Sequence, residues 1–552
     1  MSMSSPITYR DIIDQHRVEY DALIQSGRFE PFVYPWGTFG AAGVILYLLI
    51  PHAKSPILRR ARFLAWGFIT SFAIYTIRYC RARSFSPGFS VGLTSAWSIL
   101  WCANILVVHD CQTDFMRIER TEGGISRVFC RGKPATKADG AVKEHDPVPK
   151  LQDGTAPEVT HLGKPQTPLS ASALGTEAAP PQRTGRLAWQ PYPLRPFIER
   201  LDWVADVFCN FRGMGWNWQI TGLPPPPLAV QKQLQATSGT SISSKRSNTS
   251  SSGVNSYHTR SSLLRANLRI LVFGYLGLDL LKTIMMKDPY FWGLTTHGAP
   301  PHLPLLVQHS PILLRTYRLL ISQAAAYSSL NTLFSLAPLF FAGVLGPRVL
   351  GVRGEPWMYP DSYGSYRNVL DKGLAGWWGG WWHQTFRFAF EAPAKRVVRV
   401  LGLDEKGMGA RALQLGVAFA LSGSVHACGS YTMMGDTRPL RGPFAFFVLQ
   451  AGGIMLQTAA VGLLKKAGVA ERTPRLVRQL ANFVYVHVWF YYTAPLLCDD
   501  FAKGRLWLYE PIPISLFRGM GFGVEGDGWW HWGGRWAWWH WGKHWWQSGL
   551  AL

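Results

Sequence analysis

The chain has 552 residues, of which 47% are hydrophobic and 16% are charged, whereas about 25% of residues are charged in an ordinary soluble domain. Low charge together with long apolar runs argues against a soluble protein and predicts an all-α, polytopic integral membrane protein. The net charge is +23, and many of the Lys and Arg residues flank apolar segments, as in His52–Phe63. This placement fits contact with anionic lipid headgroups. Because we find no nucleic-acid-binding motif, we expect no nucleic-acid partner.

The N-terminal part is expected to begin with a polar, partly helical lead-in at residues 1–35, which is not a cleavable signal peptide. Residues 36–110 are expected to carry the first membrane helices. Their apolar runs are Trp36–Pro51, Phe63–Ile77 and Gly88–Val108. The first two runs are shorter than the roughly 20 residues that a spanning helix prefers.

Polar stretches follow these helices. Residues 111–195 are rich in Gly, Pro, Thr, Lys and acids, and we expect a solvent-exposed, largely disordered insert. Residues 196–220 are expected to form an interfacial segment, since they contain the amphipathic rings of Trp203, Trp216 and Trp218. Residues 221–263 include a serine-rich run and are expected to be a linker without regular structure.

Residues 264–500 are predicted to form the membrane core, and residues 501–552 a Trp-rich interfacial tail. The core segments are Leu268–Ile284, Ile312–Leu345 with a break at Pro338, the amphipathic Phe386–Leu401, Gly409–Met434, Pro443–Leu464 and Leu476–Leu497. About eight to ten membrane helices are expected in the whole chain. We interpret the tail histidines as part of an interfacial anchor and expect no metal site: His531, His540 and His544.

The run Gly409–Met434 is apolar, and His426 lies near its far end among small residues. At helical spacing Gly423, His426 and Ser430 share one face, so no bulky side chain blocks approach to the imidazole. An ionisable group at membrane depth is energetically expensive, which makes His426 a functional candidate. The alternative is a histidine near a helix end that reaches the membrane interface.

A second histidine, His383, stands in the aromatic run Trp377–Gln384, directly before the basic amphipathic segment. Such a histidine can bond a carbonyl oxygen or orient an acyl donor. The alternative is an interfacial aromatic belt whose histidine caps a turn.

His383 in its Trp-Trp-His-Gln setting, followed by Ser422–His426, resembles the membrane-bound O-acyltransferase superfamily. The resemblance is closest to its wax synthase branch and, within that, to the fungal acetyltransferases of terpenoid and meroterpenoid pathways. Two upstream elements match in order: Arg212–Trp218 resembles the R-G-x-G-W-x-W element, and Asp288–Gly293 resembles the D-P-x-F-x-G turn. The likeness covers about Gly88–Leu497 without the polar inserts.

The chain departs from the family pattern in three places near His383. Trp377 stands where the family usually has Phe, and Gly380 and Trp381 stand where it usually has one or two arginines. Any phosphate-binding or shaping role of those arginines must therefore lie elsewhere in this chain. The Trp-rich tail has no counterpart that we can match.

The resemblance implies that His426 acts as the general base on an acceptor hydroxyl, since a histidine of ordinary pKa, about 6.5, can accept a proton near neutrality. His383 would then polarise or position the thioester carbonyl. No nucleophilic serine or cysteine is required, and Cys428, two residues beyond His426, is expected to face another side of the helix.

Coenzyme A carries phosphates, and its head needs cations. The candidates are Arg387, Lys395, Arg396, Arg399 and Arg212. Basic residues are also normal at a membrane interface, so this alternative stays open.

The function implied is an acyl-CoA-dependent O-acyltransferase of the endoplasmic reticulum membrane that transfers an acetyl group to a hydroxyl of a lipophilic secondary metabolite. Its expected partners are acyl-CoA, a lipophilic alcohol and membrane lipids, with no bound cofactor beyond the co-substrate. One alternative is a wax-ester synthase that uses a long-chain acyl-CoA and a fatty alcohol. Another is a transporter or a non-catalytic membrane scaffold.

Overall fold

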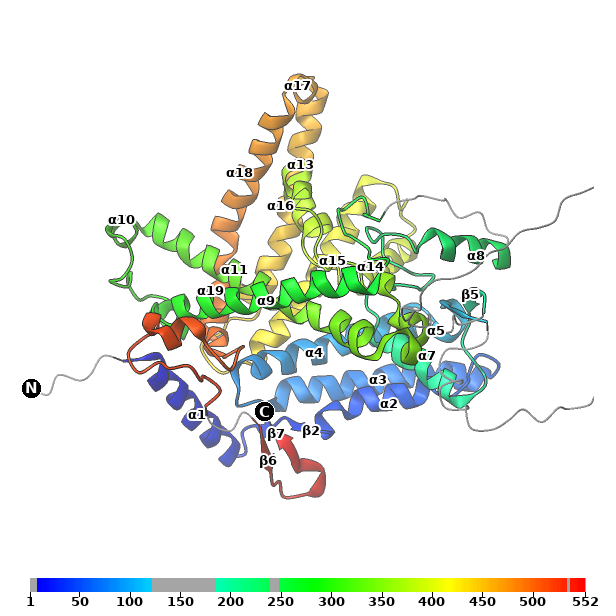
Figure 1. The fold of residues 1–552 in the computed structure, drawn as a ribbon, viewed down its shortest axis with the longest axis horizontal. Coiled ribbons are helices and arrows are strands. Elements are labelled where there is room, and N and C mark those ends of the chain that lie inside the picture. The colour runs from blue at the N-terminus through cyan, green and yellow to red at the C-terminus, as the bar shows by residue number, and fades with distance from the viewer. Residues whose placement is uncertain (1–6, 122–184, 239–247, 534–536, 552) are drawn as a thin grey trace, which may run out of the picture.

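The computed structural model describes residues 7–121, 185–238, 248–533 and 537–551, and helices dominate these ranges (Figure 1). The longer helices are α1 (Tyr9–Gln25), α2 (Phe39–Leu48), α3 (Pro56–Tyr79), α4 (Phe85–Ala103), α7 (Phe197–Cys209), α8 (Leu228–Ser238), α9 (Arg260–Met285), α11 (Pro311–Pro338), α13 (Arg367–Gly376), α14 (Arg387–Val400), α15 (Met408–Thr432), α16 (Ala445–Lys466), α18 (Arg475–Thr493) and α19 (Pro495–Lys503).

Short helices and single turns connect these elements. The short α-helices are α5 (Cys111–Asp114), α10 (Leu305–His309), α12 (Gly346–Leu350) and α17 (Val469–Arg472). The turns of other helical types are η1 (Trp36–Thr38), η2 (Asn104–Val108), η3 (Pro289–Trp292), η4 (Leu339–Leu345), η5 (Gly351–Gly354), η6 (Pro356–Met358), η7 (Trp377–Trp381), η8 (Leu440–Phe444), η9 (Leu506–Leu508), η10 (Arg518–Phe522) and η11 (Trp545–Gln547).

Within the ranges that the structure describes, three small sheets join parts of the chain that are distant in sequence. The pairs are β1 (Glu30–Pro31) parallel to β3 (Cys80–Arg81), β4 (Arg117–Arg120) antiparallel to β5 (Leu187–Gln190), and the antiparallel order β2 (Val33–Tyr34), β7 (Gly549–Ala551), β6 (Trp538–His540).

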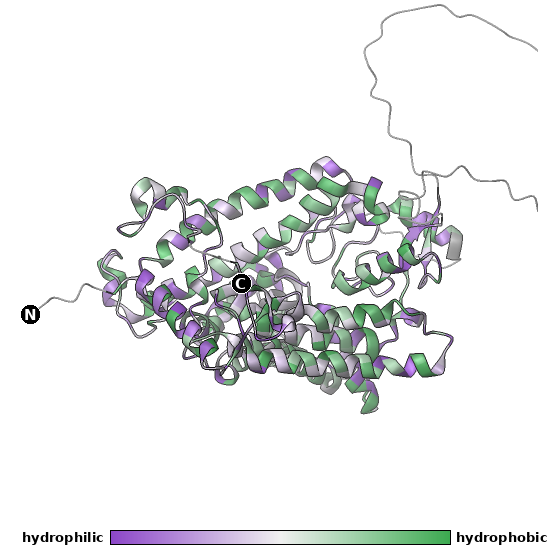
Figure 2. Cartoon of the chain, turned by 90° about the horizontal axis from the view of Figure 1, so that it is seen from below, coloured by the Kyte–Doolittle hydropathy of each residue, from purple (hydrophilic) through white to green (hydrophobic). Residues whose placement is uncertain are grey.

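Within the described residues, four helical stretches are long and apolar enough to cross a membrane, judged by length and composition. They are Phe85–Val108, Pro311–Gly354, Met408–Thr432 and Leu440–Lys466. Figure 2 shows hydrophobic residues, in green, along much of the helical ribbon. The prediction of an all-α membrane protein is confirmed, whereas the expected eight to ten spans are not, and that count stays a prediction.

Helix α3 begins earlier than its apolar run suggests because capping residues lie upstream of that run. Ser55 accepts a hydrogen bond from the Leu58 amide, and Pro56 occupies the first turn, so α3 starts seven residues before the expected Phe63. The break expected at Pro338 is present, since α11 ends there and the wider turn η4 continues the chain.

The closest helix contact in the core joins α4 to α15, the helix that carries His426. The amide of Gly92 donates to the Thr432 hydroxyl at 3.0 Å, and this hydroxyl donates to the Gly88 carbonyl at 2.7 Å. A Cβ on Gly92 would lie 1.9 Å from the carbonyl oxygen of Cys428. Glycine is therefore required for the two backbones to approach this closely.

We expect Gly92→Ala to push α4 away from α15, because a clash with backbone cannot be relieved by a side-chain rotation. Overpacking of this kind typically costs about 1–3 kcal/mol, so both the thermal unfolding temperature in detergent and the activity should fall. Gly88→Ala is the matched control on the same helix, since the nearest atom to its Cβ would lie at 3.7 Å. Equal losses in the two variants would contradict this packing argument.

The insert 111–195 is ordered at both ends, which corrects the expectation of disorder there. β4 and β5 pair from Arg117↔Gln190 to Arg120↔Leu187. The central part, residues 122–184, lies outside the described residues, so the expectation for it stays untested.

A buried ion network holds the first end of this insert in place. The Arg117 guanidinium lies 2.7 Å from the Asp202 carboxylate on α7, and Arg353 lies 2.5 Å from the same carboxylate and 3.0 Å from Glu119. Composition alone does not reveal it, because the partners come from three separate stretches of the chain.

Two further expectations about the polar stretches are wrong. The linker 221–263 contains the helix α8 and an ordered turn after residue 247, while residues 239–247 lie outside the described ranges. In the segment 196–220, Trp203 and Trp216 are fully buried rather than interfacial. They pack with Trp101, because several aromatic rings there form one apolar cluster.

Charged residues within the long helices have structural partners. Asp279 on α9 accepts hydrogen bonds from the Ser515 hydroxyl and from the amides of Leu516 and Phe517. Lys282, one turn later, donates to the Trp507 carbonyl at 2.5 Å. These contacts attach the C-terminal segment to α9.

The Trp-rich tail folds back onto the N-terminal segment, and Figure 1 shows α1 close to β6 and β7. The Trp36 indole donates to the Ser548 carbonyl at 2.8 Å, and Tyr9 donates to Asp527 at 2.5 Å. Trp541 is 81% exposed, so the interfacial role expected for the tail stays a prediction.

Candidate active site

His426 lies on α15 with one ring nitrogen already engaged. Its Nδ1 is 2.8 Å from the carbonyl oxygen of Ser422, one turn earlier. A carbonyl can only accept a hydrogen bond, so Nδ1 carries the hydrogen and Nε2 of the neutral ring keeps its lone pair. The half-buried ring packs against Phe447, with centroids 4.3 Å apart. His426 can therefore accept a proton at Nε2.

His383 lies in the turn between η7 and α14. The side-chain amide of Gln384 fixes this turn by donating to the carbonyls of Trp378 and Trp382, at 2.7 and 2.6 Å. The Nδ1 of His383 is buried and has no hydrogen-bond partner among the described residues. Aromatic rings surround the imidazole, with centroid distances of 5.4–6.0 Å: Phe334, Tyr363, Trp382 and Phe386.

One aromatic cluster connects the two histidines. Trp382 contacts His383, Trp378 contacts Trp382 at 6.3 Å, and Phe447 contacts Trp378 at 5.8 Å. Phe447 in turn packs on His426. The structure thus joins His383 and His426 through one continuous series of ring contacts.

The surroundings of His383 keep it uncharged. Burial, followed by the nearby charges of His426 and Arg212, lowers the pKa of His383 to about 3. A neutral imidazole retains one N–H and one lone pair, so it can donate a hydrogen bond to a carbonyl oxygen.

This pKa predicts a pH dependence of stability. Between about pH 6.5 and about pH 3 the unfolded chain binds a proton at residue 383 that the folded chain does not, so stability should fall as the pH drops, by at most about 1.4 kcal/mol per unit. His383→Asn should remove this part of the acid sensitivity. Thermal unfolding of both proteins in detergent near pH 7.5 and near pH 5 measures it, and an identical loss in both would contradict the prediction.

Arg212 lies near His383, but other groups already hold its guanidinium. It donates to the carbonyls of Asp361 and Pro360, at 2.8 and 2.9 Å. Burial lowers its pKa to about 10. Arg212 thus fixes the segment before the His383 turn, and two of its N–H groups are occupied.

The four cations predicted on α14 differ in their surroundings. Glu391 pairs with Arg387 at 2.5 Å and with Lys395 at 3.6 Å, and Glu405 pairs with Arg399 at 3.0 Å. Arg396 is exposed and forms no ion pair within the described ranges. Three of the four are therefore partly neutralised on their own segment.

Sequence reasoning missed the rings that join the histidines. Tyr363 is buried, its hydroxyl has no partner in the described part of the chain, and its ring contacts His383. Trp378 and Phe447 form the bridge to His426. Trp378 belongs to the aromatic run described above, but Tyr363 and Phe447 lie about twenty residues from the histidines, and aromatic residues are frequent throughout this chain.

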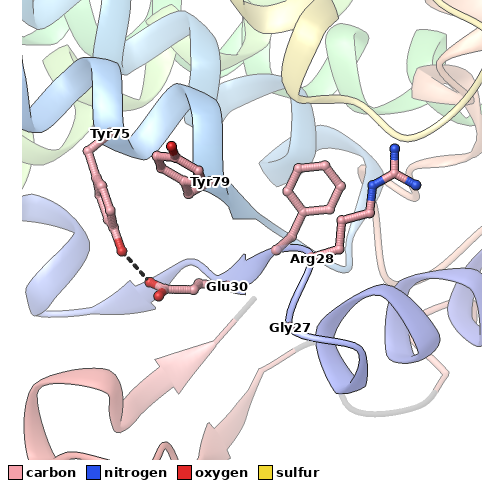
Figure 3. Close-up of a pocket in the computed structure, with 6 residues that line it drawn as sticks. Gly27, Arg28, Glu30, Tyr75 and Tyr79 are labelled. Carbon is pink, nitrogen blue, oxygen red and sulfur yellow. Dashed lines mark hydrogen bonds between the residues drawn. The ribbon is translucent and has the colours of Figure 1, made fainter.

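The tail histidines and one surface hollow lie apart from this cluster. The tail histidines have local partners, since His531 is 2.7 Å from the Gly528 carbonyl and His544 stacks on Trp546. A surface hollow of about 230 Å³ lies between the segment after α1 and the end of α3, where Tyr75 donates to Glu30 at 2.7 Å (Figure 3). Neither includes His383 or His426.

The fold and this site define an all-α membrane protein whose two candidate histidines share one aromatic cluster. Residues 359–449, which include both histidines, match the family model described as the membrane bound O-acyl transferase family. The resemblance predicted from the sequence is therefore confirmed for this stretch.

Curated relatives point the same way. The chain is 24% identical over 330 residues to the acetyltransferase ple2 of Rhodocybe pseudopiperita, covering 58% of this chain and 73% of the relative. It is 30% identical over 256 residues to the acetyltransferase eriL of Hericium erinaceus, covering 45% and 59%. It is also 24% identical over 312 residues to the O-mevalon transferase yanI of Aspergillus niger, covering 54% and 61%. The matches thus span about three-fifths to three-quarters of these relatives, and no solved structure matches the chain significantly.

Proposed function

We propose that the protein is an O-acyltransferase of the endoplasmic reticulum membrane, which transfers an acetyl group from acetyl-CoA to a hydroxyl of a lipophilic secondary metabolite of the terpenoid or meroterpenoid class. One observation carries the proposal: His426 presents a free Nε2 in the same aromatic cluster that holds a neutral His383. The family match over both histidines and the acetyltransferase names of the relatives support it.

The chemistry follows from the two nitrogens. The acceptor hydroxyl gives its proton to Nε2 of His426 while its oxygen attacks the thioester carbon. As negative charge develops on the carbonyl oxygen, an N–H of His383 donates to it. The carbon–sulfur bond then breaks, the ester is released, and the thiolate of coenzyme A takes the proton from the His426 imidazolium. Both histidines end in their starting state.

The aromatic surroundings fit a lipophilic acceptor, because indole and phenyl faces offer apolar area and no competing nucleophile. Exclusion of water also protects the thioester from hydrolysis. The acyl group is proposed as acetyl because relatives carry that name, while the name of the yanI relative indicates that the transferred group differs within the set.

An assay on microsomes that contain the protein tests the proposal. Labelled acetyl-CoA is offered with a panel of terpenoid alcohols, and labelled hexadecanoyl-CoA is offered in parallel with a fatty alcohol. We expect label in the terpenoid ester only. Formation of the wax ester alone would overturn the acetyl assignment, and consumption of neither thioester would overturn the acyltransferase assignment.

A further inference from the structure

A basic hollow of about 290 Å³ opens at the start of α3, away from the residues that the sequence suggested for phosphate binding. It is lined by Ala53, Lys54, Pro56, Arg59, Arg60, Arg62 and Phe63. Four of these seven side chains are cationic. They lie in the run whose charge fits the cytosolic side of a membrane, which is the side where coenzyme A is made.

The cations of this hollow outnumber the carboxylates beside them. Asp110 is the carboxylate that Arg59 contacts, at 2.7 Å, and Arg62 lies 3.6 Å from it. Within the described ranges, Lys54 and Arg60 form no ion pair, and the Nε of Arg62 is buried without an acceptor. The hollow therefore keeps positive charge and hydrogen-bond donors that the protein itself does not satisfy.

The helix itself adds to this positive potential. α3 is 24 residues long and begins at the hollow, so the positive end of its dipole lies there. Its first turn adds few amide donors, because Pro56 has no N–H and Ser55 accepts from the amides of Leu58 and Arg59. An anion in the hollow would thus meet guanidinium groups and a helix terminus together.

Contacts lead from this hollow to the candidate active site. Arg62 donates to the His109 carbonyl at 3.4 Å, and the His109 ring stacks on Phe388 at 5.8 Å. A series of ring contacts continues from Phe388 to Trp101, then to Trp97 and then to Phe386, with neighbouring centroids 4.5–6.2 Å apart. The ring of Phe386 lies 5.7 Å from the ring of His383. The hollow and the histidine pair are thus two ends of one packed aromatic series.

α14 also reaches this region. Phe388 on this helix stacks on the ring of His109, whose carbonyl accepts from Arg62. Arg396, which forms no ion pair within the described residues, is exposed about two turns further along the same helix.

We propose that this basic hollow binds the phosphate groups of the acyl-CoA donor, with Lys54, Arg60 and Arg62 as the principal contacts; this inference rests on the function proposed above. The diphosphate and the 3′-phosphate of coenzyme A offer the oxygens that guanidinium groups bind in pairs. The thioester arm would then lie along the aromatic series towards His383. The phosphate site thus belongs mainly to α3, and α14 contributes its end.

The test compares two donors that differ only in the nucleotide. Acetyl-CoA carries the phosphates, whereas acetyl-pantetheine lacks them. For Arg60→Gln and for Lys54→Gln/Arg60→Gln, we expect the KM for acetyl-CoA to rise about tenfold or more, which corresponds to losing one or more charge-assisted contacts, with kcat nearly unchanged. The KM for acetyl-pantetheine should stay at the wild-type value. Arg265→Gln is the control, since Arg265 is exposed on α9 and outside the hollow.

A binding measurement separates this inference from the reaction. Labelled coenzyme A is titrated onto purified His426→Ala protein with and without the Lys54→Gln/Arg60→Gln pair, and a Kd about tenfold higher is expected with the pair. An unchanged Kd, or an equal rise in KM for both donors, would overturn the assignment. Weaker binding of the variants to phosphatidic acid vesicles, at an unchanged KM for acetyl-CoA, would also overturn it, because the hollow would then hold a lipid headgroup. If wild type converts both donors while the variants behave as wild type, only this inference fails and the proposed function stands.

Discussion

His426→Ala should lower kcat for acetyl transfer by about 10²–10⁴-fold, the usual contribution of a positioned general base. The variant removes the only nitrogen of residue 426 that is free to accept a proton, since Nδ1 is used by the Ser422 carbonyl. The KM for acetyl-CoA should change little, because the thioester donor is held elsewhere. Initial rates in microsomes with equal amounts of each protein measure the effect.

His487→Ala is the matched control for this prediction. His487 makes the same contact one turn back, with Nδ1 2.8 Å from the Phe483 carbonyl, but it lies on α18, and its ring contacts Phe483 and Trp377 rather than Phe447. Activity within about twofold of wild type is expected for it. Full activity of His426→Ala, or equal losses in the two variants, would remove the general-base assignment.

Arg318→Met should destabilise the fold by about 3–5 kcal/mol, because it leaves a buried carboxylate without its partner. Arg318 donates two hydrogen bonds of 2.9 Å to Asp288, which is fully buried, and also reaches the carbonyls of His297 and Gly298. Thermal unfolding followed by size-exclusion chromatography in detergent measures the loss.

The control for this variant is Arg315→Met, one turn earlier on α11. Arg315 is exposed and lies over the ring of Tyr491, a contact worth about 0.5–1 kcal/mol. Its unfolding temperature should stay near that of wild type. Should both variants unfold at the same temperature, the Asp288 pair would not be the anchor that its geometry indicates.

The sequence allowed the fold class and the histidine pair to be predicted because both signals are local. Long apolar runs and the break at Pro338 depend on neighbouring residues alone. His383 and His426 are conspicuous for the same reason, since each is an ionisable group in an apolar stretch. That they share one cluster could not be predicted, because Phe447 and Trp378 join them only after the helices pack.

The partners of the charged residues were the hardest feature to predict from the sequence. Asp279 reads as a costly charge inside a span, yet its partners, Leu516 and Phe517, lie more than two hundred residues later. Arg387 and Lys395 looked available for phosphate, although Glu391 at helical spacing could have revealed their pairing. Trp203 was expected at an interface because composition does not distinguish a buried aromatic cluster from a membrane belt.

The bond between Trp36 and Ser548 has a consequence for biogenesis, because the two residues are 512 positions apart. During synthesis every membrane helix emerges before β7 can pair with β2. The backbone of β2 and the ring of Trp36 therefore have no partners while the helical bundle inserts and packs. Closure of this small sheet is therefore a late step in folding, because it needs residues that are synthesised after the helical bundle.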